Sequence, residues 1–209
     1  MRPQSAIHRI SPARRTRSGF TLVEMLIALT VLALVVVNIT SLVRTAGKAF
    51  DSDAASARLE EMAARTMDRV VIALAGASRN SLTPANAMPL SNPEINFRSS
   101  LGMEDGVMML GTPERIELEP ATGIVRWTRD PGTSEQKTVA WGDLVRALHD
   151  GEVDLNLWDD NDNGLVDEAG LAFALVGEEG VRVQLSLERT SESGKQVLFA
   201  LESMVNCRN

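Results

Sequence analysis

One long apolar stretch limits how this chain can fold more than any other feature of its sequence. The stretch covers residues 20–43 and is interrupted by a single charged residue, Glu24. About 20 apolar residues in an α-helix cross the ~30 Å hydrocarbon core of a bilayer, so the stretch is long enough to be a membrane segment or an export signal. We therefore expect one membrane-spanning helix near the N-terminus.

Positive charge is concentrated before this stretch. Residues 1–19 contain five arginines and no acidic residue, so their removal would take the formal net charge from −7 to −12. Arginines on this side hold the N-terminus in the cytoplasm while the rest of the chain is translocated. We expect a single-pass inner-membrane protein with its C-terminal part in the periplasm. A mature chain this acidic argues against nucleic-acid binding, which needs a clustered basic face.

The helix is expected to continue beyond the membrane segment, because no proline occurs between residue 20 and about residue 77. After Arg44 the pattern becomes amphipathic. Apolar or small residues recur at three- and four-residue steps and mark one helix face: Leu59, Met62, Ala63, Thr66, Val70, Ala73 and Leu74. We expect residues 20–43 to form the transmembrane half of one long helix and residues 44–77 its amphipathic half.

The remaining part, residues 78–209, has the pattern of a β-rich head. Residues 78–106 are rich in Pro, Asn and Ser, which is typical of an irregular connection. Beyond them, six short stretches predict strands: residues 115–118, 123–129, 136–141, 153–157, 181–187 and 196–204. Apolar residues alternate along residues 181–187 and would face one side of a sheet. We expect an α+β fold, with an antiparallel sheet packed on the amphipathic half of the helix.

The start of the apolar stretch reads RSGFTLVE over residues 17–24. A carboxylate inside a membrane helix costs at least about 2.5–3.5 kcal/mol at the helix centre and generally marks function. If the chain is cut after Gly19, the new α-amine of Phe20 is a cation near the depth of Glu24. Glu24 of one subunit can then neutralise the amine of a neighbour, so the cost of the buried charge favours assembly.

This junction resembles the class III signal of type IV pilins and type II secretion pseudopilins. The resemblance implies a pilin-like fold and a leader peptide of residues 1–19. It also implies that a prepilin peptidase cuts between Gly19 and Phe20 and methylates the Phe20 nitrogen, and that Glu24 guides docking among other pilins or pseudopilins of a filament. The alternative is an ordinary secretory signal or membrane anchor with an accidental Glu. Residues 45–47 would then offer a weak cleavage site after the apolar run.

Four stretches of the chain resemble, in order and spacing, the J-type minor pseudopilins of type II secretion and the related W-type minor pilins. They are ARLEEMAARTMDRVVIAL, RIELEPATGIVRWTRDPG, LVRALHDGEVDLNLWDDNDNG and the C-terminal VNCRN. This resemblance implies a minor, tip-associated structural subunit. Secretion, twitching and DNA-uptake roles stay open. The competing function is a signal-anchored periplasmic binding domain or enzyme that is not assembled into a filament.

An acidic loop, DDNDNGLVDE at residues 159–168, follows the start of a calcium loop. Oxygen ligands at positions 1, 3, 5 and 9, with a carbonyl at position 7, would surround Ca²⁺, and these are Asp159, Asn161, Asn163, Asp167 and the Leu165 carbonyl. Position 12 is Gly170 instead of a bidentate Glu, so we expect weak calcium binding, with a Kd of ~10⁻⁴–10⁻³ M. The alternative is a solvated acidic turn. We expect bound Ca²⁺ to rigidify the loop and stabilise the head.

Nothing in the sequence favours an enzyme. The order of residues contains no Ser-His-Asp arrangement, phosphate loop or dinucleotide fingerprint. Cys207 is the only cysteine, so no intrachain disulfide can form. The three tryptophans are expected to be packing anchors of the sheet, with Trp158 partly exposed beside the acidic loop. We therefore expect a structural role without catalytic turnover.

Overall fold

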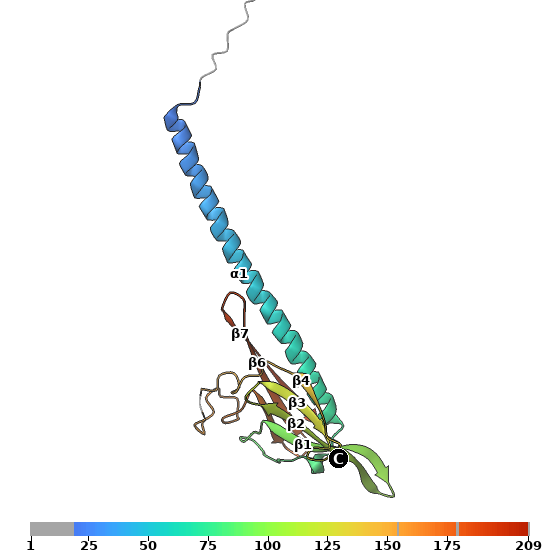
Figure 1. The fold of residues 1–209 in the computed structure, drawn as a ribbon. Helices are drawn as coiled ribbons and strands as arrows, with labels where there is room; N and C mark the ends of the chain where they lie inside the picture. The colour runs from blue at the N-terminus through green and yellow to red at the C-terminus, as the bar shows by residue number, and fades with distance from the viewer. Residues whose placement is uncertain (1–18, 154, 179, 209) are drawn as a thin grey trace, which may run out of the picture. The chain divides into compact units, whose positions relative to one another are not determined.

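A computed structural model of the chain describes residues 19–153, 155–178 and 180–208. Residues 1–18, most of the expected leader peptide, lie outside the described residues. One long helix, α1 (Leu22–Ala75), is followed by a short 3-10 helix, η1 (Arg79–Ser81), and by seven strands (Figure 1). The chain divides into two compact units, Met1–Gly47 and Lys48–Asn209. Each is described separately below.

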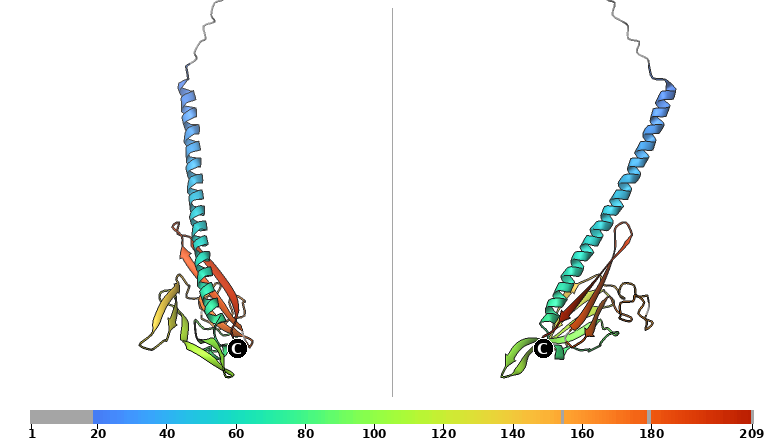
Figure 2. Two further views of the ribbon diagram at one scale, coloured as in Figure 1. Left: turned by 90° about the vertical axis from the view of Figure 1, so that its right-hand side faces the viewer. Right: turned by 180° about the vertical axis from the view of Figure 1, so that it is seen from behind.

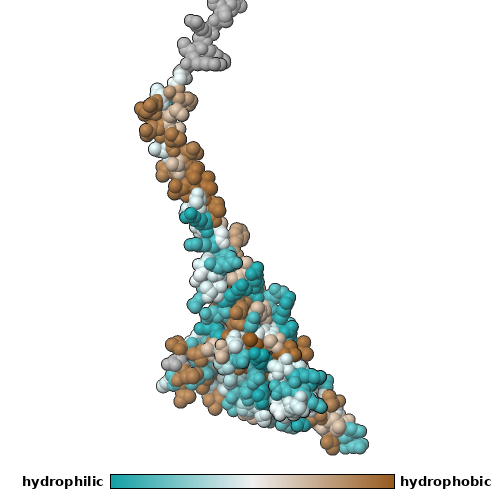
Figure 3. All heavy atoms as spheres, in the orientation of Figure 1, coloured by the Kyte–Doolittle hydropathy of each residue, from teal (hydrophilic) through white to brown (hydrophobic). Residues whose placement is uncertain are grey.

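In the first unit, the described residues form the N-terminal part of α1, whose apolar side chains are exposed along its length (Figure 3). The polar side chains in this part bond to carbonyls of their own helix: Thr30 Oγ1 to Ile27 at 2.8 Å and Asn38 Nδ2 to Leu34 at 2.9 Å. Such bonding is what a hydrocarbon environment requires, because lipid offers no hydrogen-bond partners. By length and composition, α1 can cross a membrane. It is consistent with an inner-membrane anchor.

In the second unit, the C-terminal part of α1 buries the expected apolar face. The buried residues of α1 recur at three- and four-residue steps, and they are Ala55, Leu59, Ala63, Thr66, Met67, Val70 and Leu74. The charged residues Glu61, Arg65 and Arg69 lie on the exposed face. The predicted amphipathic pattern is therefore confirmed. The helix ends at Ala75, just before Gly76, about two residues earlier than expected.

The strands form two antiparallel sheets instead of the single sheet that we expected (Figure 2). The first has the order β1-β2-β3-β4, from β1 (Glu94–Glu104), β2 (Val107–Glu119), β3 (Ile124–Arg129) and β4 (Lys137–Gly142). The second has the order β5-β6-β7, from β5 (Leu171–Val176), β6 (Gly180–Thr190) and β7 (Gln196–Asn206). Helix and antiparallel strands together confirm the α+β, pilin-like fold class.

Three strand predictions were wrong. Residues 78–106 contain strand β1, although their composition indicated an irregular connection; only Ile95 and Phe97 of this strand are buried, so the alternating signal is short. β5 was missed because its sequence, LAFALV, is buried on both faces and shows no alternation. Conversely, the alternating residues 153–157 form no strand where they are described, and Val153 and Leu157 are exposed.

The core lies where the two sheets meet the second part of α1. Val181, Val183, Leu185 and Leu187 of β6 are all fully buried, which confirms the predicted alternation. Opposite them, the apolar residues of α1 complete the same cluster. At the edge of the first sheet, Trp127 and Trp141 stack with ring centroids 5.7 Å apart. The core therefore depends on residues from the helix and from both sheets.

Strand β4 is attached to α1 by hydrogen bonds to one carbonyl. The Trp141 carbonyl accepts a bond of 2.8 Å from Arg69 Nη1 and a longer bond of 3.4 Å from Thr66 Oγ1. The next residue, Gly142, has no side chain, and an added Cβ would overlap the hydroxyl of the buried Thr66. The close approach of helix and strand therefore requires glycine at this position.

We expect Gly142→Ala to destabilise the head by about 1–3 kcal/mol, because the added methyl group must displace Thr66 in a packed core. Gly111→Ala is the matched control, since an added Cβ there makes only ordinary contacts, the nearest at 3.5 Å. The measurement is thermal unfolding of the detergent-solubilised chain, followed by near-ultraviolet circular dichroism. Equal midpoints for the two variants would contradict this explanation of Gly142.

Candidate functional site

The N-terminal candidate site is built around the first turn of α1. Glu24 Oε2 accepts a 2.8 Å bond from the Thr21 backbone N–H and a 2.9 Å bond from the Thr21 hydroxyl. The hydroxyl of Thr21 in turn accepts a 3.3 Å bond from the Glu24 N–H. These reciprocal bonds form a capping box, in which a Thr and the Glu three residues later satisfy N–H groups that the helix leaves unpaired. The Glu24 carboxylate is therefore held at the helix start.

Gly19 and Phe20 lie immediately before this cap. Neither is helical, because α1 begins at Leu22, and the Phe20 side chain is 82% exposed. A peptide bond outside regular structure is open to a protease, which must bind its substrate in an extended form. The geometry at Gly19–Phe20 is thus compatible with cleavage. Cleavage there, Phe20 methylation and the assembly role of Glu24 stay predictions.

The second candidate site is the long connection between β4 and β5, which contains the acidic loop. It packs against the polar face of β6. Ser186 is fully buried; its hydroxyl lies 2.8 Å from His149 Nδ1 and accepts a 3.1 Å bond from the Asp150 N–H. Gln184, also on this face, is 2% exposed. β6 is therefore covered on both faces, and the connection is fixed to the sheet by buried polar contacts.

Within the loop, the side chains of Asp159 and Asn163 fold the backbone into a tight turn. Asp159 accepts bonds from the N–H groups of Asn163 at 3.0 Å and Gly164 at 2.7 Å. Asn163 Oδ1 accepts a 2.8 Å bond from the Leu165 N–H. Gly164 has a φ of +87°, in the left-handed region that favours glycine. Asp159, Asn161 and Asn163 of the expected metal set are thus part of one compact turn.

The two acidic residues that follow have different surroundings. Asp167 accepts bonds of 2.7–3.1 Å from the backbone N–H groups of Asn156 and Leu157. Glu168, in contrast, is fully buried, and its Oε1 accepts bonds from the side-chain amides of Asn161 and Asn163. Sequence reasoning missed Glu168 because it lies at position 10 of the loop. The sequence feature that could have indicated its burial is its position just before the apolar stretch that forms β5.

Within residues 19–153, 155–178 and 180–208, no group of three or more His, Cys, Asp or Glu side chains is arranged to hold a metal ion. Calcium, however, also takes amide and carbonyl oxygens. The residues that meet at this loop offer both kinds, together with the buried carboxylate of Glu168. The predicted calcium ligand set, Asp159, Asn161, Asn163, Leu165 and Asp167, stays a prediction.

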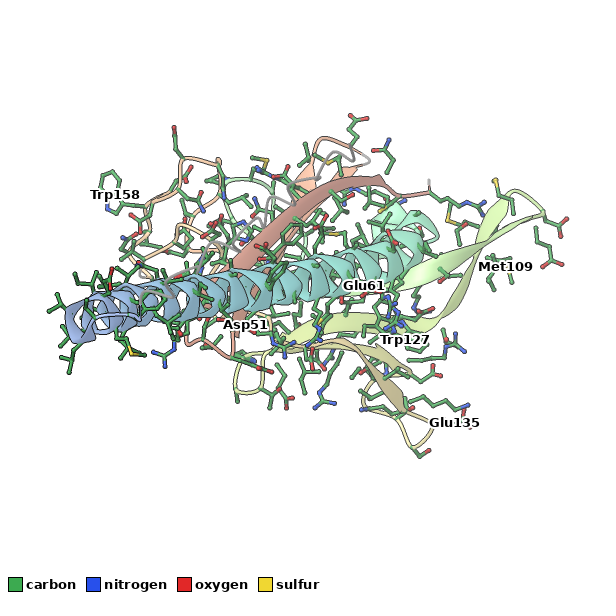
Figure 4. All side chains as sticks on the ribbon, turned by 90° about the horizontal axis from the view of Figure 1, so that it is seen from above. Asp51, Glu61, Met109, Trp127, Glu135 and Trp158 are labelled. Atoms are coloured by element: carbon green, nitrogen blue, oxygen red, sulfur yellow. The ribbon has the colours of Figure 1, made fainter. Side chains whose placement is uncertain are left out.

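A hollow of about 500 Å³ lies between α1 and the β4 edge. Its rim carries four arginines, Arg58, Arg65, Arg69 and Arg189, around apolar surface from Met62, Ile124 and Trp141. Glu61 in the same hollow forms an ion pair with Arg65 (Glu61 is labelled in Figure 4). Guanidinium groups beside an aromatic ring suit a surface that holds acidic side chains.

Comparison with known families identifies one match, the prokaryotic N-terminal methylation motif, over residues 14–37. The match contains the junction and the capping box. It confirms the resemblance to type IV pilins and type II secretion pseudopilins that the RSGFTLVE sequence indicated. Searches of curated proteins and of solved structures found no match to the chain. The motif is typical of structural filament subunits, so the chain is prepilin-like.

We expect Ser186→Ala to destabilise the head by about 1–3 kcal/mol, because the Asp150 N–H and the His149 ring lose a buried partner. Ser56→Ala is the matched control: Ser56 lies on the exposed face of α1, and its hydroxyl bonds to the Ser52 carbonyl of its own helix at 3.0 Å. Thermal unfolding compares the two. A midpoint for Ser186→Ala as high as that of the control would show that the buried contact does not hold the connection on β6.

Proposed function

We propose that this prepilin-like chain is a structural subunit, cut by a prepilin peptidase and assembled into a type II secretion pseudopilus or a type IV pilus. The observation that carries the proposal is the methylation motif over residues 14–37, which coincides with the start of an exposed apolar helix. The head lies in the periplasm, the helix anchors the precursor in the inner membrane, and the chain catalyses no reaction. Within the filament it is a minor, tip-associated subunit of the J or W type.

The processing step uses the exposed junction before α1. The peptidase cuts between Gly19 and Phe20 and methylates the new nitrogen of Phe20. Both residues precede the helix, so cleavage breaks none of the α1 hydrogen bonds. The product keeps Thr21 and Glu24, and with them the capping box.

The assembly step uses the Glu24 carboxylate. Both bonds from Thr21 end on Oε2. Oε1 is therefore the atom that accepts the bond from the Phe20 amine of a neighbouring subunit. A charge-assisted bond of this kind replaces an isolated charge in lipid, where the cost of ionised groups is high. The exposed apolar surface of the first part of α1 packs against helices of neighbouring subunits in the same step.

The end of the β1–β2 hairpin supports assembly of the head as well. Leu101, Met103, Val107 and Met109 are exposed there, with exposed fractions of 44–72% (Met109 is labelled in Figure 4). Contiguous exposed apolar residues on a soluble head are typical of contact surfaces. We assign this hairpin to contacts with a neighbouring head in the filament.

Mass spectrometry of the N-terminus tests the processing step. In cells with the assembly system, we expect the chain to start at Phe20 and to carry an added methyl group. The signal-anchored alternative predicts an intact N-terminus or a cut after residue 43. The control variant is Gly19→Leu, because leucine is bulky. Gly19→Ala would be less informative, since alanine is small like glycine. An unprocessed wild-type chain would reject the proposal.

Three variants separate the charge of Glu24 from its capping role. Glu24→Gln keeps the capping box, since Gln also occurs at this position of the motif, but removes the charge. Glu24→Val removes both, while Thr21→Val keeps the charge and removes the hydroxyl. We expect all three to insert and to be processed, and only Thr21→Val to co-purify with partner subunits at near wild-type levels. Normal incorporation of Glu24→Gln would overturn the charge-pairing argument.

A further inference from the structure

We propose that the acidic loop is a calcium site whose principal carboxylate is Glu168, a residue outside the calcium-loop pattern. The remaining ligands come from the turn that precedes it, and they are Asp159, Asn161, Asn163 and the Leu165 carbonyl. Glu152 is a second buried carboxylate, in the segment of the connection that precedes the loop. The proposal does not depend on filament assembly, because it concerns only residues of the head.

The first support is unpaired buried negative charge. Glu168 is fully buried, and its Oε2 has no hydrogen-bond partner among the described residues. Glu152 is 6% exposed; the Asp160 backbone lies near its carboxylate, but no hydrogen bond of normal geometry forms there among the described residues. Two buried carboxylates with so few partners are costly unless a cation neutralises them.

The second support is the group of oxygen donors around Glu168. Asn161 and Asn163 both direct their side-chain amides at Glu168 Oε1, from positions 3 and 5 of the loop. Asn161 Nδ2 also lies 3.0 Å from the Asp150 carbonyl. The Oδ1 atoms of Asn161 and Asn163 accept bonds from the N–H groups of Asn163 and Leu165, and each keeps a second lone pair that a cation can use.

The third support is the Asp159 bond to Gly164. In a calcium loop, the residue at position 1 must fold toward the turn at position 6, and here Asp159 Oδ2 accepts the Gly164 N–H at 2.7 Å. The turn from Asp159 to Gly164 thus folds toward position 6 as this loop requires.

Packing explains why position 12 cannot supply that carboxylate. Gly170 occupies it, and a Cβ there would overlap the backbone carbonyl of Arg146. The Gly170 carbonyl accepts a 2.6 Å bond from the Ser186 N–H, so this backbone is fixed on β6. Glu168, two residues earlier, is held instead by the 2.8 Å bond from the His149 N–H to its carbonyl. Its side chain points inward to the loop.

The chemistry of these donors selects calcium. Carboxylate, amide and carbonyl oxygens are ligands of hard cations, and calcium accepts six to eight of them in flexible geometry. Magnesium demands near-ideal octahedral geometry, which a loop of this kind does not impose. Bound calcium would join segment 149–152 to the loop through Glu152 and Glu168. The exposed apolar residues Val153, Leu157 and Trp158 lie between these two segments in the chain (Trp158 is labelled in Figure 4).

Calcium titration of the full chain in detergent micelles, after treatment with a chelator, tests the proposal. We expect one site with a Kd of ~10⁻⁴–10⁻³ M or tighter, and weaker binding of magnesium. In about 10 mM calcium, the thermal midpoint of the head should rise by about 3 °C or more over that in chelator. The absence of calcium binding to the wild-type chain at these concentrations would overturn the proposal.

Matched variants identify the carboxylate. Glu168→Gln should weaken calcium binding at least about tenfold, since a charge-assisted ligand is lost. Asp162→Asn removes one charge from an exposed position of the same loop and should leave the affinity within about twofold. Asp167→Asn should also retain binding, because Asp167 accepts backbone bonds outside the turn. Wild-type affinity in Glu168→Gln, or loss of binding only in Asp167→Asn, would reject Glu168 as the ligand.

Folding of the key variant is controlled separately. Without calcium, Glu168→Gln should melt at or above the wild-type midpoint, because the substitution removes a buried charge. If it does not fold, Asn161→Ala replaces it. The substitution removes only the amide and keeps the Cβ of Asn161. That Cβ packs closely on Gly151, where an added Cβ would lie 2.6 Å from it. This variant should bind calcium at least about fivefold more weakly, and unchanged affinity would count against the site.

Discussion

The apolar stripe on the second part of α1 is the contact on which the head depends. The two small sheets, of four and three strands, share one hydrophobic core with this helix. Leu59, Val70 and Leu74 fill the space between them and are fully buried. The same helix also fixes the edge of the first sheet through the Trp141 carbonyl. One helix therefore supplies both the shared core and the position of an edge strand.

The outer face of β6 shows a second way of stabilising a sheet. Gln184 and Ser186 would normally face water in an antiparallel sheet with one covered side. Here the connection between β4 and β5 covers them, and His149 and Asp150 supply their partners. Because polar groups are buried on this face, the connection has to return to one definite position. That requirement brings Glu152 and Glu168 into the interior, where each carboxylate has few partners.

Much of the fold could be predicted from local patterns, and the remainder depended on tertiary contacts. The spacing of Leu59, Ala63 and Val70 gave the buried face of the helix, and the alternation from Val181 to Leu187 gave the core face of β6. β5 could not be recognised, because burial on both faces removes the alternation on which the prediction rests. The described residues of the alternating stretch 153–157 form no strand, so a correct period predicted the wrong structure.

The candidate sites divide in the same way. The junction was readable because its chemistry lies within a few consecutive residues, and the methylation motif supports that interpretation. The turn from Asp159 to Gly164 is also local. Glu168 could not be found from spacing, because its environment is created by two tertiary contacts. Gly170 packs closely on the backbone of Arg146, and the His149 N–H bonds to the Glu168 carbonyl. Both contacts join residues that are far apart in the sequence.

The capping box at Thr21 and Glu24 has a consequence for the order of events. A helix N-terminus carries a partial positive charge from its aligned peptide dipoles, equivalent to roughly half an elementary charge. In the uncut chain this end is neutralised by Glu24. Removal of the leader would place a full cation next to the same end, so one carboxylate would face two positive sources. Proteolysis would thereby convert an electrostatically balanced helix start into one that attracts additional negative charge.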